Sequence, residues 1–166
     1  SGLFVAEGAS VLMAARDNGW RPNILVHGAE ARDSPAHRGL IDWALREGTE
    51  GLEVSRVVLE KLAAKENPQN LMGVFEQRWV ETGSDPATML SRLDGNVRAA
   101  GSDPNMADVI LALEEIRDPG NLGTILRTVE AVGAKGVILV GSCCDPFSHE
   151  AVRATMGSIF HVPIAR

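Results

Sequence analysis

The part of the chain that begins at Val109 constrains the fold most, because apolar runs alternate there with helical patterns. Three runs are typical of strands: "VILALEEI", "GVILVG" and "FHVPIAR". The first helical segment ends at Gly133 and carries its apolar residues at helical spacing: Leu122, Ile125, Leu126, Val129 and Val132. A second helix is expected from Ser148, its candidate N-cap. Buried strands that alternate with helices predict a parallel sheet.

The first part of the chain shows a similar alternation over roughly 75 residues, the size of a small domain. Four strands are expected: "GLFVAEG", "RPNILVHG", "GLEV" and "QNLMGVFEQ". Three helices are expected between them: "ASVLMAARDNG", "SPAHRGLIDWALREG" and "SRVVLEKLAAKENP". The second helix carries Leu40, Ile41, Ala44 and Leu45 on one face, and the third is expected to bury Val57, Val58 and Leu62. This pattern predicts a compact α/β unit.

Residues 79–107 differ from both parts in composition. They are rich in Gly, Ser, Asp and Pro and contain "SDP" twice, which is typical of a linker. We therefore expect one domain over residues 1–78, a linker over 79–107 with one helical turn at "ATMLSRL", and a second domain over 108–166. The alternative is a loop-rich edge of either domain.

The charge balance argues against nucleic-acid binding by electrostatics alone. The formal net charge is −6, and Asp and Glu outnumber Lys and Arg in both halves of the chain. Because phosphate contacts need cations, a polyanionic partner would require a local basic patch, a second protomer or residues outside this chain.

The two cysteines, Cys143 and Cys144, are adjacent, so they cannot join distant segments and do not have the spacing of a zinc site. We expect two free thiols in a reducing compartment and no metal. No apolar run approaches the ~18 residues of a membrane span, and the start of the sequence lacks a signal-peptide pattern. The expected location is the cytoplasm.

The segment "EEIRDPGN" is the first candidate for a functional site. It follows an expected strand and leads into a helix, and ligands of parallel sheets bind at the carboxyl ends of the strands. Asn121 is expected to be the N-cap of that helix. Because helical side chains lean toward the N-terminus, Arg127 should point back toward Asn121 and Thr124. An amide, a hydroxyl and a guanidinium near one helix start would suit an anion or an oxyanion.

Two other interpretations of this segment stay open. It could be an ordinary capped helix in which Arg127 pairs with Glu130 or another carboxylate. A nucleotide-binding loop is a weaker alternative, because "GNLG" has the pattern G-x-x-G and no Gly-Lys-Ser/Thr follows. The next helix carries Arg153, and its loop should open at the same sheet edge. Gly157 is expected to allow a close approach of backbones near the end of that helix.

Together these segments resemble two motifs of the SpoU (TrmH) family of RNA ribose methyltransferases, within the SPOUT class. The first motif, Asn-x-Gly-x-x-x-Arg with a helix ending in Gly-Ala, is matched by Asn121, Gly123, Arg127, Gly133 and Ala134. The second motif is matched by Arg153, Thr155, Gly157, Phe160 and Pro163, with Thr155 where the family more often has serine. "FVAEGASVLMAARDNG" resembles the ribosomal-protein-like domain that commonly precedes the methyltransferase domain.

The resemblance implies an α/β fold with a small N-terminal ribosomal-protein-like substrate-binding domain and a truncated parallel-sheet SPOUT domain of the trefoil-knot type. It implies methyl transfer from S-adenosylmethionine to a ribose 2′-hydroxyl of tRNA or rRNA, by a homodimer that binds structured RNA. Arg127 and Asn121 would be catalytic. Three residues would contact RNA: Arg153, Thr124 and His149. Gly141 and Gly157 would contact the cofactor.

The sequence departs from the family pattern at its end. The third motif, which supplies much of the S-adenosylmethionine pocket, should follow Arg166. We therefore expect an incomplete cofactor site here and a longer full-length protein. The first rival is a non-catalytic RNA-binding protein that has lost its cofactor half. The second is a small-molecule α/β enzyme, which would need a ribose-binding acid about 20 residues after a glycine loop, and "GVILVGSCC" supplies none.

Overall fold

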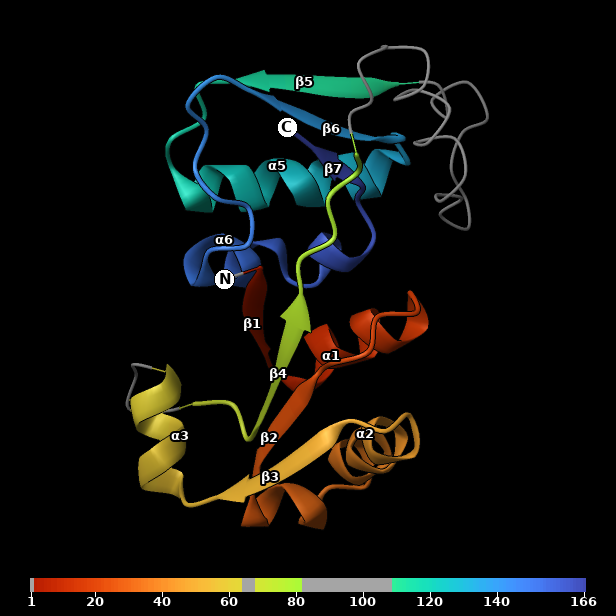
Figure 1. The fold of residues 1–166 in the computed structure, drawn as a ribbon, viewed down its shortest axis with the longest axis vertical. Coiled ribbons are helices and arrows are strands. Elements are labelled where there is room, and N and C mark those ends of the chain that lie inside the picture. Colours follow the sequence, from red (N-terminus) through yellow and green to blue (C-terminus); the bar gives the residue numbers. More distant parts are fainter. Residues whose placement is uncertain (1, 64–67, 82–108) are drawn as a thin grey trace. The chain divides into compact units, whose positions relative to one another are not determined.

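The computed structural model describes residues 2–63, 68–81 and 109–166 (Figure 1). The chain divides into two compact units, Ser1–Glu76 and Gln77–Arg166. Most of the expected linker, and the helical turn expected at residues 87–93, lie outside the described residues. No helix in the described ranges is both long enough and apolar enough to span a membrane.

The first unit is a four-stranded mixed sheet with helices. Its elements are β1 (Leu3–Glu7), α1 (Ala9–Asp17), β2 (Ile24–Gly28), a 3-10 turn (Ala29–Asp33), α2 (Pro35–Arg46), β3 (Glu50–Val54), α3 (Arg56–Ala63) and β4 (Leu71–Glu76). The strand order is β1-β4-β2-β3, with β4 antiparallel to both neighbours and β2 parallel to β3. Phe4 stacks on Phe75 with ring centroids 5.6 Å apart. The strands and helices expected from the sequence are all present.

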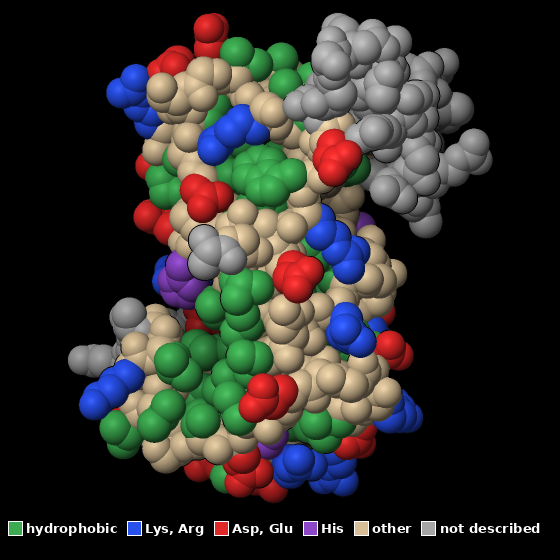
Figure 2. All heavy atoms as spheres, viewed as in Figure 1, with side chains coloured by type: hydrophobic (Ala, Val, Ile, Leu, Met, Phe, Trp, Pro, Cys, Tyr) green, Lys and Arg blue, Asp and Glu red, His purple; other side chains and the backbone are tan. Residues whose placement is uncertain are grey.

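Helix α3 buries a different face from the one expected. Val57, Val58 and Leu62 are 61%, 41% and 56% exposed, so the prediction that they are buried was wrong. Leu59 and Ala63 lie one helical turn apart and are buried against β2 and β4. Apolar residues surround much of this short helix, and the sheet covers only the side with Leu59. Apolar side chains are correspondingly visible on the surface beside α3 in Figure 2. In α2, Leu45 is also exposed.

The second unit is built on a three-stranded parallel sheet, as predicted. Its elements are β5 (Ile110–Glu114), α5 (Pro119–Val132), β6 (Gly136–Val140), α6 (His149–Thr155), a 3-10 turn (Ser158–Phe160) and β7 (Ile164–Ala165). The strand order is β5-β6-β7, and both pairs are parallel. Gly133 ends α5 in the left-handed conformation, and the Ser148 side chain caps α6. Both helix boundaries were predicted from the sequence.

The β5 strand is less buried than the sequence suggested. Ala112 and Glu114 are exposed, and the other residues of the strand are half-buried. The reason is its position at the edge of the sheet, where the described residues provide no further strand. On the opposite edge, the backbone N–H of Val80 donates to the carbonyl oxygen of Ile164 at 2.9 Å. The start of the expected linker therefore lies against β7.

Candidate active site

Helix α5 begins earlier than expected. Asp118, not Asn121, is the N-cap, and its Oδ1 accepts a hydrogen bond from the backbone N–H of Asn121 at 2.6 Å. Pro119 follows as the first helical residue, a position where its fixed φ fits and its missing N–H costs nothing. The prediction of Asn121 as N-cap was wrong because Asp118 caps the helix and Pro119 starts it. Asn121 instead lies in the first turn, with its side chain exposed.

Arg127 is exposed and makes no hydrogen bond or ion pair with the described residues. The alternative partner, Glu130, is engaged elsewhere: it accepts a hydrogen bond from Ser158 and lies 2.9 Å from Nδ1 of His161. Pairing of Arg127 with Glu130 is therefore not observed. The guanidinium of Arg127 is available to an anion.

Thr124 lies between Asn121 and Arg127 along α5 and is also exposed. Its hydroxyl donates to the carbonyl oxygen of Gly120 at 3.0 Å, which leaves its lone pairs as acceptors. Successive steps of three residues keep these three side chains on neighbouring parts of the helix surface. The amide, the hydroxyl and the guanidinium are thus all exposed along α5, each within one helical turn of the next.

Helix α6 carries the residues expected to contact RNA. His149, its first residue, and Arg153 are both exposed. The neighbour of Arg153, Ala154, packs against Gly123 of α5, where a Cβ atom would lie 2.8 Å from the Ala151 carbonyl oxygen. Gly123 is therefore needed for the close approach of α5 and α6. This role was not inferred from the sequence.

Two further residues of the second motif shape the turn after α6. Thr155 is buried, and its hydroxyl donates to the carbonyl oxygen of Val152 at 2.7 Å and accepts from the backbone N–H of Gly157 at 3.3 Å. Gly157 has φ 109°, which a side chain would disfavour. This motif position is occupied by a small hydroxyl residue because the hydroxyl satisfies two buried backbone groups.

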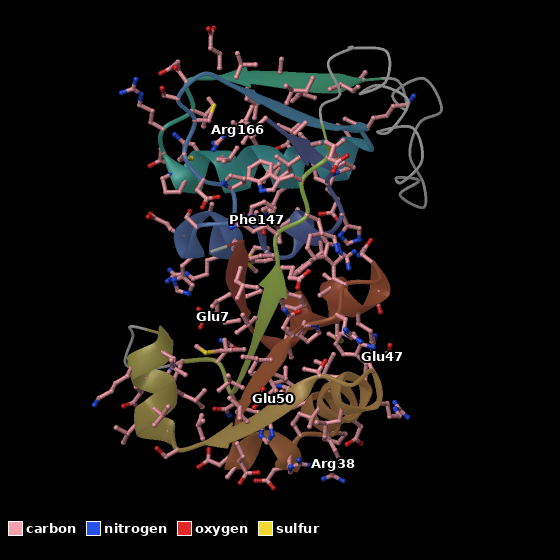
Figure 3. The ribbon with its side chains drawn as sticks, in the orientation of Figure 1. Glu7, Arg38, Glu47, Glu50, Phe147 and Arg166 are labelled. Atoms are coloured by element: carbon pink, nitrogen blue, oxygen red, sulfur yellow. The ribbon has the colours of Figure 1, made fainter. Side chains whose placement is uncertain are left out.

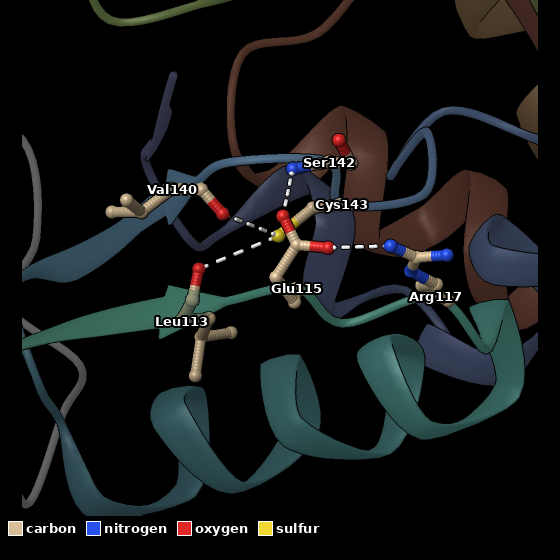
Figure 4. Close-up of polar contacts among 6 residues, drawn as sticks. All are labelled: Leu113, Glu115, Arg117, Val140, Ser142 and Cys143. Carbon is tan, nitrogen blue, oxygen red and sulfur yellow. Dashed lines mark hydrogen bonds and ion pairs between the residues drawn. The ribbon is translucent and has the colours of Figure 1, made fainter.

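The carboxyl ends of β5 and β6 are joined by Glu115, a residue that the sequence analysis did not single out (Figure 4). Its Oε1 accepts from the backbone N–H of Ser142 at 2.7 Å, and its Oε2 accepts from Arg117 at 2.8 Å. The Ser142 N–H, followed by the Arg117 guanidinium, lowers the pKa of the Glu115 carboxyl below its ordinary value. The sequence signal that could have identified Glu115 is its position as a carboxylate directly after an expected parallel strand.

The thiol of Cys143 lies at the same edge and donates to the carbonyl oxygens of Leu113 and Val140, at 3.4 and 3.2 Å. Both cysteines are free, and burial raises the pKa of the Cys144 thiol. The carbonyl oxygens of both cysteines accept from Arg166, which also lies over the ring of Trp79 (5.5 Å to the centroid). The Trp79 ring also packs against Phe147, with ring centroids 5.1 Å apart. Figure 3 labels Arg166 and Phe147. Among the described residues, no cluster of His, Cys, Asp or Glu could hold a metal ion.

The two glycines expected at a cofactor have different surroundings. Gly141, with φ 69°, precedes α6 and faces the Glu115 carboxylate, whereas Gly157 follows α6 and is buried.

Comparisons with known proteins agree with the fold. Residues 108–166 match the model of the SpoU rRNA Methylase family, and residues 1–73 match the MRM3-like substrate binding domain. The AdoMet-bound rRNA methyltransferase from Sinorhizobium meliloti is 39% identical, with a TM-score of 0.75 over 99% of this chain and 54% of that chain. The SpoU methyltransferase AviRb from Streptomyces viridochromogenes with AdoMet is 26% identical, with a TM-score of 0.72 over 98% of this chain and 53% of that chain.

A curated relative also aligns along the chain. The 23S rRNA (uridine(2479)-2'-O)-methyltransferase of Streptomyces viridochromogenes is 27% identical over 100% of this chain and 51% of its own length. The chain thus spans about half the length of this relative and of the two solved structures.

Proposed function

This chain belongs to the SpoU rRNA Methylase family, and from that premise we propose that it forms the RNA-binding side of a 2′-O-methyltransferase. The full-length protein would transfer a methyl group from S-adenosylmethionine to a ribose 2′-hydroxyl of tRNA or rRNA. The observation that carries the proposal is the exposed group of Asn121, Thr124 and Arg127 on α5, with the guanidinium unpaired by the described residues. The similarity to 2′-O-methyltransferases supports it.

The chemistry assigned to Arg127 is electrostatic. A ribose hydroxyl that attacks a methyl group loses its proton and develops negative charge on oxygen. A guanidinium offers N–H donors and no acceptor, so Arg127 cannot act as the base. Arg127 instead stabilises the developing alkoxide or holds an adjacent phosphate, and Asn121 orients the hydroxyl by hydrogen bonding. The proton leaves to an RNA phosphate or to solvent.

The remaining site residues complete the proposal. Arg153 and His149, exposed on α6, and Thr124 on α5 would contact RNA. Residues 1–78 would bind structured RNA through its shape and backbone. Residues 79–107 would be the linker to the second domain, and residues 108–166 would be part of the SPOUT domain. S-adenosylmethionine supplies the methyl group when bound, with Gly141 and Gly157 as its contacts in this chain.

A homodimer in the cytoplasm is part of the same proposal. Lys, Arg, Asp and Glu side chains are interspersed on the face shown in Figure 2, and the formal net charge is −6. A second protomer would bring its own Arg127 and Arg153 to the same RNA and so raise the number of cations around it, although the net charge stays negative. The two free cysteines suit a reducing compartment.

Substitution of Arg127 tests the proposed function. In the full-length protein, Arg127→Ala should lower methyl transfer to RNA by about 10²–10³-fold, the usual effect of removing one transition-state donor. The matched control is Thr128→Ala, which truncates the next exposed residue of α5 outside the motif. Near-normal transfer by Arg127→Ala would overturn the assignment. RNA binding without methyl transfer by the unaltered protein would favour the non-catalytic rival.

A further inference from the structure

The strands β5 and β6 end in the same unusual way. Glu115 follows β5 with φ 55°, and Gly141 follows β6 with φ 69°. Left-handed backbone is ordinary for glycine but strained for glutamate. A residue keeps such a conformation only where its surroundings hold it, and such residues cluster at functional sites. The contacts of the Glu115 side chain are therefore informative.

Glu115 is held by both carboxylate oxygens. Oε1 takes the backbone N–H of Ser142 at 2.7 Å, and Oε2 takes Nη2 of Arg117 at 2.8 Å. Gly141 provides the necessary space, because a Cβ atom there would lie 2.5 Å from Oε1 of Glu115. Glu115, Gly141 and Ser142 form a matched set in which the loop after β6 is shaped around a carboxylate from the end of β5. Figure 4 shows Glu115 between Ser142 and Arg117.

Backbone contacts extend this connection toward α5. The N–H of Glu115 donates to the carbonyl oxygen of Val140 at 3.2 Å, and the N–H of Cys144 donates to that of Ile116 at 2.8 Å. Only Arg117 separates Ile116 from Asp118, the N-cap of α5. Arg117 is itself bound to Glu115, so the carboxylate contacts both the loop after β6 and the residue next to the N-cap of α5, beside these two backbone bonds.

We propose that Glu115 is a positioning residue, whose carboxylate fixes the loop after β6 to the loop before α5 and so holds Asn121 and Arg127 in place for catalysis. The inference rests on the proposed function. Glu115 acts through Ser142 and Arg117 and does not contact the reacting atoms. A small displacement of catalytic groups lowers the rate strongly, which is how a remote carboxylate can affect turnover.

The test is Glu115→Gly in the full-length protein. Glycine relieves the left-handed strain, which offsets the loss of both side-chain contacts, so the melting temperature should change little. We expect kcat to fall about tenfold with little change in KM for RNA. Glu115→Gln keeps an oxygen acceptor for the Ser142 N–H and should recover part of the lost kcat. Glu114→Gln, at the exposed end of β5, is the matched control and should leave kcat unchanged.

Two outcomes would overturn the inference while the proposed function stands. The first is that the wild-type protein is active and the Glu115→Gly variant has the same kcat. The other is amide hydrogen exchange at Ser142 that is equally slow in wild type and Glu115→Gly, because the carboxylate is the partner of that N–H. A wild-type protein that methylates no RNA would overturn the proposed function and this inference with it.

Discussion

Gly123 of α5 and Ala154 of α6 lie in backbone contact, so that a Cβ atom on Gly123 would lie 2.9 Å from the carbonyl carbon of Ala154. The glycine of the Asn-x-Gly-x-x-x-Arg motif thus sets the distance between the helix with Arg127 and the helix with Arg153. The packing of α5 against α6 therefore requires a glycine at position 123, independently of what the two arginines do.

Gly123→Ala should destabilise the second unit by about 1–3 kcal/mol, since overpacking displaces one helix from the other. Gly39→Ala is the matched control, because Gly39 is also helical but has open space around its Cα atom. That control should stabilise the protein by roughly 0.5–1 kcal/mol. Chemical denaturation of both variants measures the difference. Equal effects of the two substitutions would show that α5 and α6 are not in close contact.

Asp118→Ala should cost about 1 kcal/mol in the free energy of unfolding, because it removes the acceptor for the Asn121 N–H at the start of α5. Asp118→Asn keeps an acceptor oxygen and should cost less. Urea titration measures the free energy of unfolding of both variants. An equal loss in both would mean that the cap contributes through charge rather than through its hydrogen bond.

Glu115 should make the stability of the second unit depend on pH. Its folded-state pKa is lowered from the ordinary value of 4.5, so its contribution is fully present above that value. The contribution is lost as the pH falls through the lowered pKa, because protonation weakens the bonds to Ser142 and Arg117. The melting temperature of wild type should therefore fall more steeply below pH 4.5 than that of Glu115→Gln. Parallel curves would contradict this.

Leu59→Ala should cost about 2–5 kcal/mol, whereas Leu62→Ala should be nearly neutral. Both leucines lie on α3, but Leu59 is 1% exposed and Leu62 is 56% exposed. The comparison uses identical substitutions on one helix, so differences in helix propensity cancel. A larger loss of unfolding free energy for Leu62→Ala than for Leu59→Ala would show that Leu62 lies on the buried face of α3, as the sequence pattern suggested.

The order of elements could be predicted from the sequence, because alternating apolar runs, Gly133 and Ser148 each leave a local signal. The buried face of α3 could not, because Val57, Val58, Leu59, Leu62 and Ala63 surround most of the helix. Periodicity then does not select one side. The start of α5 was misplaced by three residues, since aspartate and asparagine are equally good N-caps.

The candidate site also contains residues that could be predicted from the sequence and one that could not. Asn121 and Arg127 belong to a contiguous motif, and their exposure on one helix follows from their spacing. Glu115 was missed because its partner, Ser142, lies 27 residues away and is engaged through its backbone. Residue types predict neither a left-handed backbone at a glutamate nor a hydrogen bond donated by a backbone N–H.

The most direct test of the central claim is the chemical position of the transferred methyl group. The full-length protein is incubated with labelled S-adenosylmethionine and tRNA or rRNA, and the RNA is digested to nucleosides for mass spectrometry. We predict a nucleoside labelled on the ribose 2′-oxygen with wild type and almost none with Arg127→Ala. A methyl group on a base, or equal 2′-O-methylation by Arg127→Ala, would contradict the account.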